Sequence, residues 1–317
     1  MCFPLKARNL LTSRRMMMTN KQSRYLAIDI GGTYIKSAFL DEEGRIIERY
    51  SSISTPYDKK QYIDTIFEIV EQTKEKPAGV AVSTSGIIDN DTGTYLQSGS
   101  FPFMISENLK DLIESKYNLT ASVVNDGQAA LYGEMWKGKL RKQRNALLVT
   151  IGTGIVGGLL INGQPYLGAH GMAGELSSIT QDEKEGYFPV KYSSTHFIER
   201  ASQIIGLDEP DGQEVFRNLY QGKQDLDQLF TDYCYLVSLL LFNLQVTLDP
   251  ELIVISGGIS NQEIFIEELR KQCDIIYKNK SEAYLGPGHL KITASAFRSD
   301  ANLLGALYFY KTKYESE

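Results

Sequence analysis

The feature that most constrains this chain is a pattern that occurs twice along it: an apolar strand that ends in a glycine turn, then further strands and helices. In the first copy, the apolar run Tyr25–Ile30 is followed by Gly31 and Gly32. A buried strand that closes in a turn is the natural interpretation. Two more strands are predicted for 34–40 and 45–51, separated by turn residues.

The second copy begins with Ala146–Ile151, which ends at Gly152. Val156–Ile161 is predicted to be the next strand, because Asn162-Gly163 follows it and this dipeptide is the strongest short hairpin signal. Helices are expected from about 195 to 248, before a late buried strand at Leu252–Ser256. Two similar α/β halves with a cleft between them are the architecture that this repetition predicts.

The chain is long enough for two domains, with 317 residues of which 42% are hydrophobic. We expect a disordered tail at 1–24, an N-terminal lobe at 25–124, a C-terminal lobe at 125–298 and a closing helix at 299–317 that packs back on the N-terminal lobe. The tail is basic and has no continuous apolar stretch, so it does not resemble a signal peptide. It is either a disordered segment or an over-long start.

Charge and cysteine content exclude several classes of function. The net charge of −6 gives no electrostatic basis for binding nucleic acid. The longest apolar run, Tyr235–Val246, is too short and too often interrupted to span a bilayer and predicts a buried helix. Cys2, Cys234 and Cys273 lie far apart, which predicts inert thiols in a reducing cytoplasm and no structural zinc.

Three glycine turns follow predicted buried strands. They are the first glycine loop (Asp29–Thr33), the second glycine loop (Gly152–Gly154) and the third glycine loop (Ser256–Gly258). One such loop is usually only a turn, but three at the ends of strands favour a site for an anion, because glycine lets backbone N–H groups approach a ligand closely. Asp29 adds a carboxylate of the kind that a phosphate-bound Mg²⁺ uses, directly or through water.

Two local motifs need a choice between interpretations. Gly152–Gly157 matches the dinucleotide fingerprint GxGxxG, but a strand and a hairpin turn follow it instead of a helix, so the match is accidental. Asp126 follows the apolar strand 121–124 and opens a predicted helix, which makes it the best catalytic candidate. The alternative is that Asn125 or Asp126 only caps that helix, and the two roles are compatible.

Several motifs in this order resemble those of the ROK family (repressors, open reading frames, kinases). The motifs are DIGGTYIK at Asp29–Lys36, VNDGQAA at Val124–Ala130, the long segment Ile151–Leu176, LDPELIVISGGIS at Leu248–Ser260 and ANLLGAL at Ala301–Leu307. The resemblance covers about residues 25–310. It implies a two-domain actin-like ATPase fold (ribonuclease H-like) with a duplicated βββαβα core and an interdomain cleft, shared with hexokinase, actin and the heat-shock chaperones.

The resemblance also implies a role for individual residues. For ATP and Mg²⁺, the implied cofactor-binding residues are Asp29, Gly31, Gly32, Thr33, Lys36, Gly152, Thr153, Gly154, Gly257 and Gly258, with Asp29 near the metal through water or ATP. Gly257 and Gly258 match an adenosine-binding turn. The implied sugar-binding residues are Asn125, Asp126 and Glu175, with Asp126 as the general base.

This chain departs from the family pattern after Glu175. Ser178 stands where the kinases of the family usually carry a histidine, and Thr180–Ser194 contains none of the cysteines of their zinc loop. We therefore expect no zinc. The resemblance implies an ATP-dependent kinase that phosphorylates a hexose or hexose derivative at O6, as a glucokinase does. It also implies a homodimer, the usual assembly in the family.

Other functions remain open at this point. Within the kinases, the alternatives are a β-glucoside kinase and an N-acetylmannosamine kinase. A non-catalytic sugar-sensing regulator is the alternative of another class. A DNA-binding repressor is disfavoured because only about 24 residues precede the first strand, too few for a helix-turn-helix domain.

Overall fold

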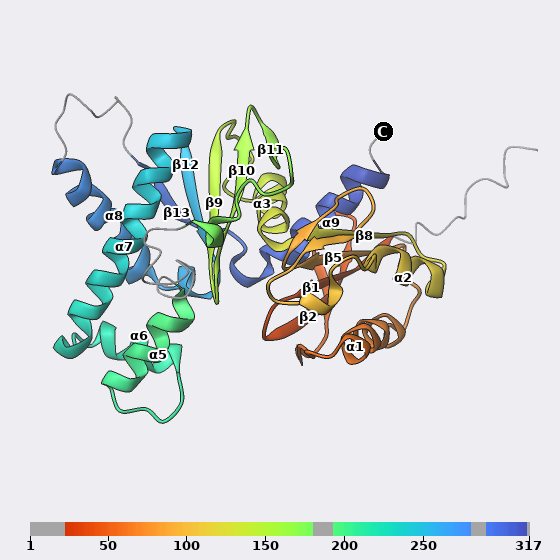
Figure 1. The fold of residues 1–317 in the computed structure, drawn as a ribbon, viewed down its shortest axis with the longest axis horizontal. Helices are drawn as coiled ribbons and strands as arrows, with labels where there is room; N and C mark the ends of the chain where they lie inside the picture. The colour runs from red at the N-terminus through yellow and green to blue at the C-terminus, as the bar shows by residue number, and fades with distance from the viewer. Residues whose placement is uncertain (1–22, 180–192, 280–289, 316–317) are drawn as a thin grey trace, which may run out of the picture.

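The computed structural model describes residues 23–179, 193–279 and 290–315 of the chain (Figure 1). Its strands form two main sheets. The first has the spatial order β3 (Ile46–Arg49), β2 (Tyr34–Asp41), β1 (Arg24–Ile30), β5 (Gly79–Thr84) and β8 (Ala121–Asn125), with β4 (Ile53–Ser54) paired to β2. The second has the order β11 (Gln164–Tyr166), β10 (Ile155–Ile161), β9 (Ala146–Ile151), β12 (Leu252–Ser256) and β13 (Ile292–Ala294).

The two sheets have the same topology. In each, the first strand of the repeat pairs antiparallel with the strand that follows it and parallel with a later strand, as β1 does with β2 and β5, and β9 with β10 and β12. The duplicated α/β fold predicted from the glycine-turn pattern is therefore confirmed. The strand predicted at 45–51 is present in a shorter form as β3, and the short strand β4 that follows it was not predicted.

Helices lie beside both sheets and between them (Figure 1). They are α1 (Lys59–Glu71), α2 (Leu109–Tyr117), α3 (Asp126–Lys137), α5 (Ser194–Ile204), α6 (Gly212–Tyr220), α7 (Gln224–Leu248), α8 (Glu263–Lys278) and α9 (Ala301–Tyr314). Short 3₁₀ turns lie at η1 (Pro102–Met104), η2 (Leu176–Ser178), η3 (Gly258–Asn261) and η5 (Arg298–Asp300), and β6 (Ile87–Ile88) forms a small hairpin with β7 (Tyr95–Gln97). Asx caps begin several helices, as Asp58 does for α1 by accepting a hydrogen bond from the Gln61 N–H at 2.9 Å.

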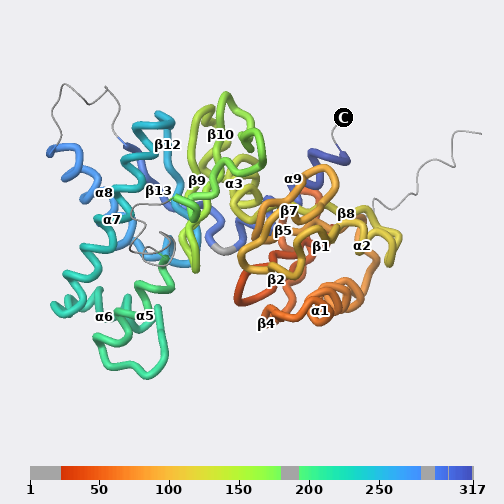
Figure 2. The backbone as a smooth tube through the Cα atoms, in the orientation of Figure 1, coloured from red at the N-terminus to blue at the C-terminus, as the bar shows by residue number. Residues whose placement is uncertain are grey.

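Each sheet is covered by helices on both faces, so its central strands are almost entirely buried. In β1, Leu26 and Ile28 pack against α1, whereas Tyr25 and Ala27 face α9. In β9, alternate residues likewise face opposite sides: Leu147 and Val149 pack with α5, α7 and α8, whereas Ala146 and Leu148 pack with α3. Helices α3 and α9 consequently lie between the two sheets, which Figure 2 shows at the centre of the molecule.

Helices α3 and α9 cross in close backbone contact at two glycines. A Cβ atom at Gly305 would lie 1.6 Å from the carbonyl oxygen of Ala129, and one at Gly133 would lie 2.6 Å from that of Ala301. Neither position tolerates a side chain without separating the helices. The crossing matters for the site described below, because α3 begins at Asp126 and α9 begins one residue before Asn302.

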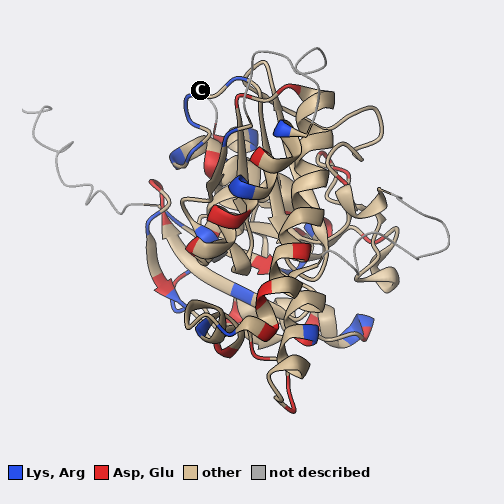
Figure 3. Ribbon diagram, turned by 90° about the vertical axis from the view of Figure 1, so that its left-hand side faces the viewer, with Lys and Arg blue, Asp and Glu red and all other residues tan. Residues whose placement is uncertain are grey.

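The apolar run 235–246 belongs to the longer helix α7. This helix of 25 residues has the length and hydropathy of a membrane span, but half of its most apolar window is buried inside the protein, where residues such as Val237 and Leu241 join the core. The prediction of a buried helix is confirmed. Burial also raises the pKa of the Cys273 thiol to about 11, which keeps it protonated and unreactive. Basic and acidic residues are interspersed over the face shown in Figure 3.

Candidate active site

Asn125 and Asp126 lie where strand β8 passes directly into helix α3. The side chain of Asn125 caps the helix, since its Oδ1 accepts a hydrogen bond from the Gln128 N–H at 3.1 Å. Asp126 is the first helical residue, and its Oδ1 accepts only from the adjacent Gly127 N–H at 2.8 Å among the hydrogen bonds of the described residues. The cap is therefore Asn125, which leaves the Asp126 carboxylate available for another role.

The surroundings of Asp126 favour its protonated form more than water would. Burial is the main cause, and the negative charges of Glu175 and Asp29 add to it, so that the pKa rises from the ordinary 3.8 to about 7. Burial also raises the pKa of Glu175. The charges of two carboxylates that are distant in sequence, Glu175 and Asp29, thus both act on Asp126. A carboxylate with a pKa near neutrality can exchange a proton at physiological pH, which general acid–base catalysis requires.

Asn125 joins Asp126 to Glu175. Its Nδ2 donates to the carbonyl oxygen of Gly86 at 2.8 Å and to Oε1 of Glu175 at 3.4 Å. The second distance is long for a hydrogen bond, so this N–H can be shared with a ligand hydroxyl at little cost. The three residues expected to bind sugar are therefore adjacent in the structure. Gly86 was missed in the sequence analysis, although its φ of +120° is a conformation that favours glycine.

Asp29 lies at the end of β1 and is almost fully buried. Its Oδ1 accepts hydrogen bonds from Ser83 Oγ at 3.0 Å and from Asn302 Nδ2 at 2.9 Å. Burial raises the pKa of Asp29, and the bond from Asn302, the charge of Lys36 and the bond from Ser83 partly offset this rise. Lys36 acts from the neighbouring strand, because it pairs with Asp29 in the β1–β2 ladder.

Ser83 and Asn302 were not predicted as site residues. Ser83 pairs with Asp29 in the parallel β1–β5 ladder, so the strand order would have revealed it. Asn302 belongs to the motif ANLLGAL, but nothing in the sequence indicates that it reaches a residue 273 positions away.

The second and third glycine loops lie side by side at the carboxyl ends of β9 and β12. Gly257 has a φ of +92°, and a Cβ atom there would lie 2.1 Å from the carbonyl oxygen of Ile151, the residue that precedes Gly152. Thr153 is exposed between Gly152 and Gly154. The pairing of β9 with β12 therefore brings together the two loops that the sequence places about 100 residues apart.

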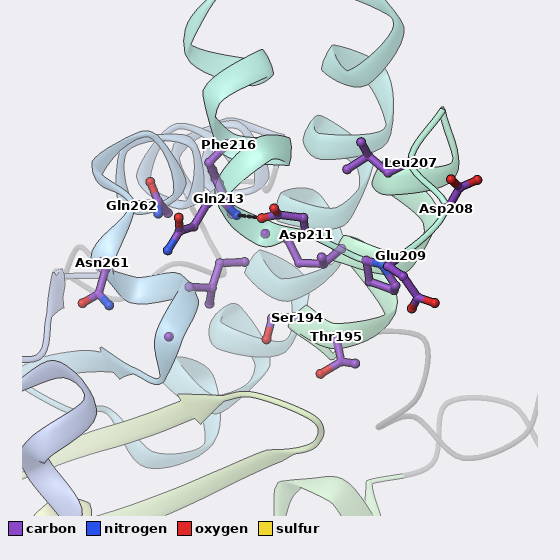
Figure 4. A pocket seen from close by; sticks show the side chains of 15 residues that line it. Ser194, Thr195, Leu207, Asp208, Glu209, Asp211, Gln213, Phe216, Asn261 and Gln262 are labelled. Carbon is purple, nitrogen blue, oxygen red and sulfur yellow. Dashed lines mark hydrogen bonds between the residues drawn. The ribbon is translucent and has the colours of Figure 1, made fainter. Parts of the chain in front are cut away.

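A cavity of about 1010 Å³ opens beside Gly258. Figure 4 shows it between the start of α5, the α5–α6 connection, α6 and η3. Its lining includes apolar and polar side chains: Thr195, Ile198, Leu207, Gln213, Phe216, Asn261 and Gln262. Of this lining, only Gly258 could be predicted from the sequence, because the other residues belong to no motif. The size and mixed lining suit a nucleoside.

Metal ligation by protein side chains alone is not seen in the described part of the chain, where no group of three His, Cys, Asp or Glu residues is suited to hold an ion. Most of Thr180–Ser194, which lacks the cysteines of a zinc loop, falls at 180–192 and lies outside the described residues. Asp29 is the carboxylate that the first glycine loop offers to a cation. Because its Oδ1 already accepts two hydrogen bonds, Oδ2 is the oxygen better suited to a metal or a metal-bound water.

Comparison with known proteins gives a consistent result. The family model described as the ROK family matches residues 25–313. The chain is 30% identical over 292 residues to a β-glucoside kinase of Listeria monocytogenes, covering 90% of this chain and 96% of the relative. It is 29% identical to an N-acetylmannosamine kinase of Vibrio cholerae, with 91% and 99% covered. A crystal structure of a ROK family protein from Streptococcus pneumoniae in complex with sucrose is 26% identical, with a TM-score of 0.78 and 92% and 98% covered.

Proposed function

Because the chain belongs to the ROK family, we propose that it is an ATP-dependent sugar kinase in which Asp126 takes the proton from the hydroxyl group that is phosphorylated. The acceptor is a hexose or hexose derivative, and the hydroxyl is O6. The observation that carries this proposal is the position of Asp126: a carboxylate with a pKa raised to about 7, next to Asn125 and Glu175 and within the electrostatic influence of Asp29.

The proposed reaction is an in-line transfer. The sugar oxygen attacks the γ-phosphorus of ATP, the bond from that phosphorus to the bridging oxygen of ADP breaks, and the hydroxyl proton passes to Asp126. Asn125 and Glu175 orient the sugar through its neighbouring hydroxyl groups. Bound Mg²⁺ would neutralise charge on the transferring group. Asp29 and, across the strand pair, Lys36 would hold this end of the nucleotide.

The nucleotide is proposed to lie along the glycine loops of the second sheet. Thr153 and the amides around it face the phosphates, and the adenosine enters the cavity beside Gly258. Phe216 and Ile198 supply apolar surface to the base, and Gln213 and Gln262 supply hydrogen-bonding groups (Figure 4). Asp29 and Asn302 would keep the triphosphate end next to Asp126, because α9 and α3 are in contact.

Among hexose derivatives, β-glucosides are the acceptors that we test first. The relatives that match nearly this whole chain at 30% identity are named β-glucoside kinases. Ser178 occupies the position where the kinases of the family usually carry a histidine, and its side chain is exposed. Because serine is smaller than histidine, it leaves more room for a substituent on the sugar. An N-acetylmannosamine kinase is the second candidate, supported by the Vibrio cholerae relative. A cytoplasmic homodimer is also part of the proposal.

The experiment is a coupled assay of ADP release with glucose, mannose, fructose, N-acetylmannosamine and cellobiose as acceptors. We expect sugar-dependent ADP release with at least one of them, and cellobiose phosphorylation would assign the β-glucoside activity. Asp126→Asn should bind sugar as the wild type does and lose at least about 10²-fold in kcat. Asp227→Asn, which changes an exposed carboxylate on α7, is the matched control. Sugar binding without ADP release from any acceptor would identify a non-catalytic sugar sensor instead.

A further inference from the structure

Three carbonyl groups of the first glycine loop accept hydrogen bonds from one short segment of the chain. Thr55 Oγ1 donates to the carbonyl oxygen of Gly31 at 2.7 Å, and its backbone N–H donates to that of Thr33 at 3.0 Å. The hydroxyl group of Tyr57 donates to the carbonyl oxygen of Gly32. Three consecutive carbonyls of the loop therefore face the short segment 55–57.

This arrangement fixes the direction of the neighbouring amides. In a trans peptide the carbonyl of one residue and the N–H of the next point in opposite directions. The N–H groups of Gly32 and Thr33 must therefore point away from Thr55 and Tyr57. Within the described residues, neither of these two N–H groups donates a hydrogen bond, whereas the Gly31 N–H donates to Tyr34 inside the turn.

Asp29, at the place of the proposed phosphoryl transfer, lies on the face of the first sheet opposite to α1. The segment 55–57 leads from β4 into α1, which covers the face of the first sheet formed by residues such as Ile28 and Ile30. Asp29 lies between these residues in β1 and points to the other face, where it meets Asn302 of α9. The free amides of the loop therefore point away from the segment that leads into α1.

The second copy of the fold repeats this device. Ser194 donates to the carbonyl oxygen of Gly152 twice, from its N–H at 3.0 Å and from its Oγ at 3.1 Å. By the same peptide geometry, the Thr153 N–H points away from Ser194. Ser194 begins α5, which is the first helix of the second copy within the described residues, and the segment 55–57 leads into α1, the first helix of the first copy.

We propose that Thr55, Tyr57 and Ser194 are positioning residues that orient the amides of the two glycine loops toward the phosphates of the nucleotide. The inference rests on the proposed function, because it concerns the same site. Glycine permits either orientation of its peptides, so an unsupported loop would expose carbonyl oxygens as readily as amides. Hydroxyl groups that hold the carbonyls remove this freedom before the nucleotide arrives, and preorganised donors need no rearrangement during the reaction.

The decisive variant is Thr55→Val, which removes the hydroxyl group and keeps the volume of a side chain that is only 6% exposed. We expect the affinity for AMPPNP, measured by calorimetry, to fall about tenfold, the loss of one hydrogen bond of 1–1.5 kcal/mol. The affinity for adenosine, which has no phosphate, should be unchanged. Thr55→Ser restores the hydroxyl group and should recover most of the AMPPNP affinity.

Thr73→Val is the matched control, because Thr73 Oγ1 also donates to a backbone carbonyl, that of Val70, at the far end of α1. It should leave both affinities as in the wild type. If Thr55→Val does not fold, Tyr57→Phe provides the test, because the Tyr57 side chain is 67% exposed and its hydroxyl group is not needed for the core. Its effect on AMPPNP affinity should be about two- to threefold, since an exposed hydrogen bond contributes less.

Two results would overturn the inference. One is wild-type affinity for AMPPNP in both Thr55→Val and Tyr57→Phe. The other is an equal loss of affinity for adenosine and AMPPNP, which would indicate a general disturbance of the lobe. A wild-type protein that binds AMPPNP but phosphorylates no sugar would refute the proposed function alone, because the orientation of the loops is judged by nucleotide binding.

Discussion

Replacing Asp126 by asparagine should stabilise the free protein at alkaline pH, although it should lower kcat by at least about 10²-fold. The folded protein holds the proton of this carboxyl up to about pH 7, whereas the unfolded chain releases it near the ordinary pKa of 3.8. Between these pH values the folded state binds more protons than the unfolded state. Protonated Asp126 therefore makes its full contribution to the free energy of unfolding below pH 3.8. This contribution declines as pH rises and is lost above about pH 7.

The size of this effect follows from the pKa difference. The interval from 3.8 to about 7 corresponds to about 4 kcal/mol in total. Asp126 retains partial contact with solvent, which screens the charge, so we expect about 2 kcal/mol between pH 5 and pH 8. Removing the charge at position 126 also relieves its repulsion of Glu175, which acts in the same direction. Asparagine does not titrate, so the free energy of unfolding of the variant should increase relative to that of the wild type as pH rises.

The assay is calorimetric unfolding of the ligand-free proteins from pH 5 to pH 8. The melting temperature of Asp126→Asn minus that of the wild type should increase by about 4 °C over this range. Asp227→Asn, with its exposed carboxylate, should show no such trend. A difference that stays constant or decreases with pH would refute the argument that Asp126 is held at a raised pKa, even if the variant had lost its activity.

Two further substitutions test the architecture around the site. Gly305→Ala should lower the free energy of unfolding by about 3 kcal/mol or more, because its Cβ would lie 1.6 Å from the carbonyl oxygen of Ala129. Urea unfolding measures this loss. The control is Gly99→Ala, which should change the free energy of unfolding little, because no atom lies within 4 Å of a Cβ there. A mild effect at Gly305 would contradict the close crossing of α3 and α9. Asn302→Ala removes a hydrogen bond that lowers the pKa of Asp29. The pKa of Asp29 should therefore rise further in this variant. The Mg²⁺ concentration needed for half-maximal turnover should then increase, more at pH 6.5 than at pH 8.5, and an equal increase at both pH values would contradict this role.

Much of the fold could be predicted from local patterns. The apolar runs that end at Gly31 and Gly152 identified the first strand of each copy, and both are strands in the structure. The strand after Gly154 was the reason to reject a dinucleotide fingerprint, and β10 confirms that interpretation. The boundaries of the two lobes stay a prediction, as do the roles given to individual site residues.

The sequence by itself determined the strands, the turns and the position of Asp126 at a strand end, because periodicity and turn chemistry are properties of neighbouring residues. Only the tertiary structure decided which distant groups meet there. Asn302 reaches Asp29 because α9 packs against β1, and Thr55 reaches Gly31 because β4 pairs with β2. Such contacts depend on strand order and helix packing, which leave no trace in the spacing of residues along the chain.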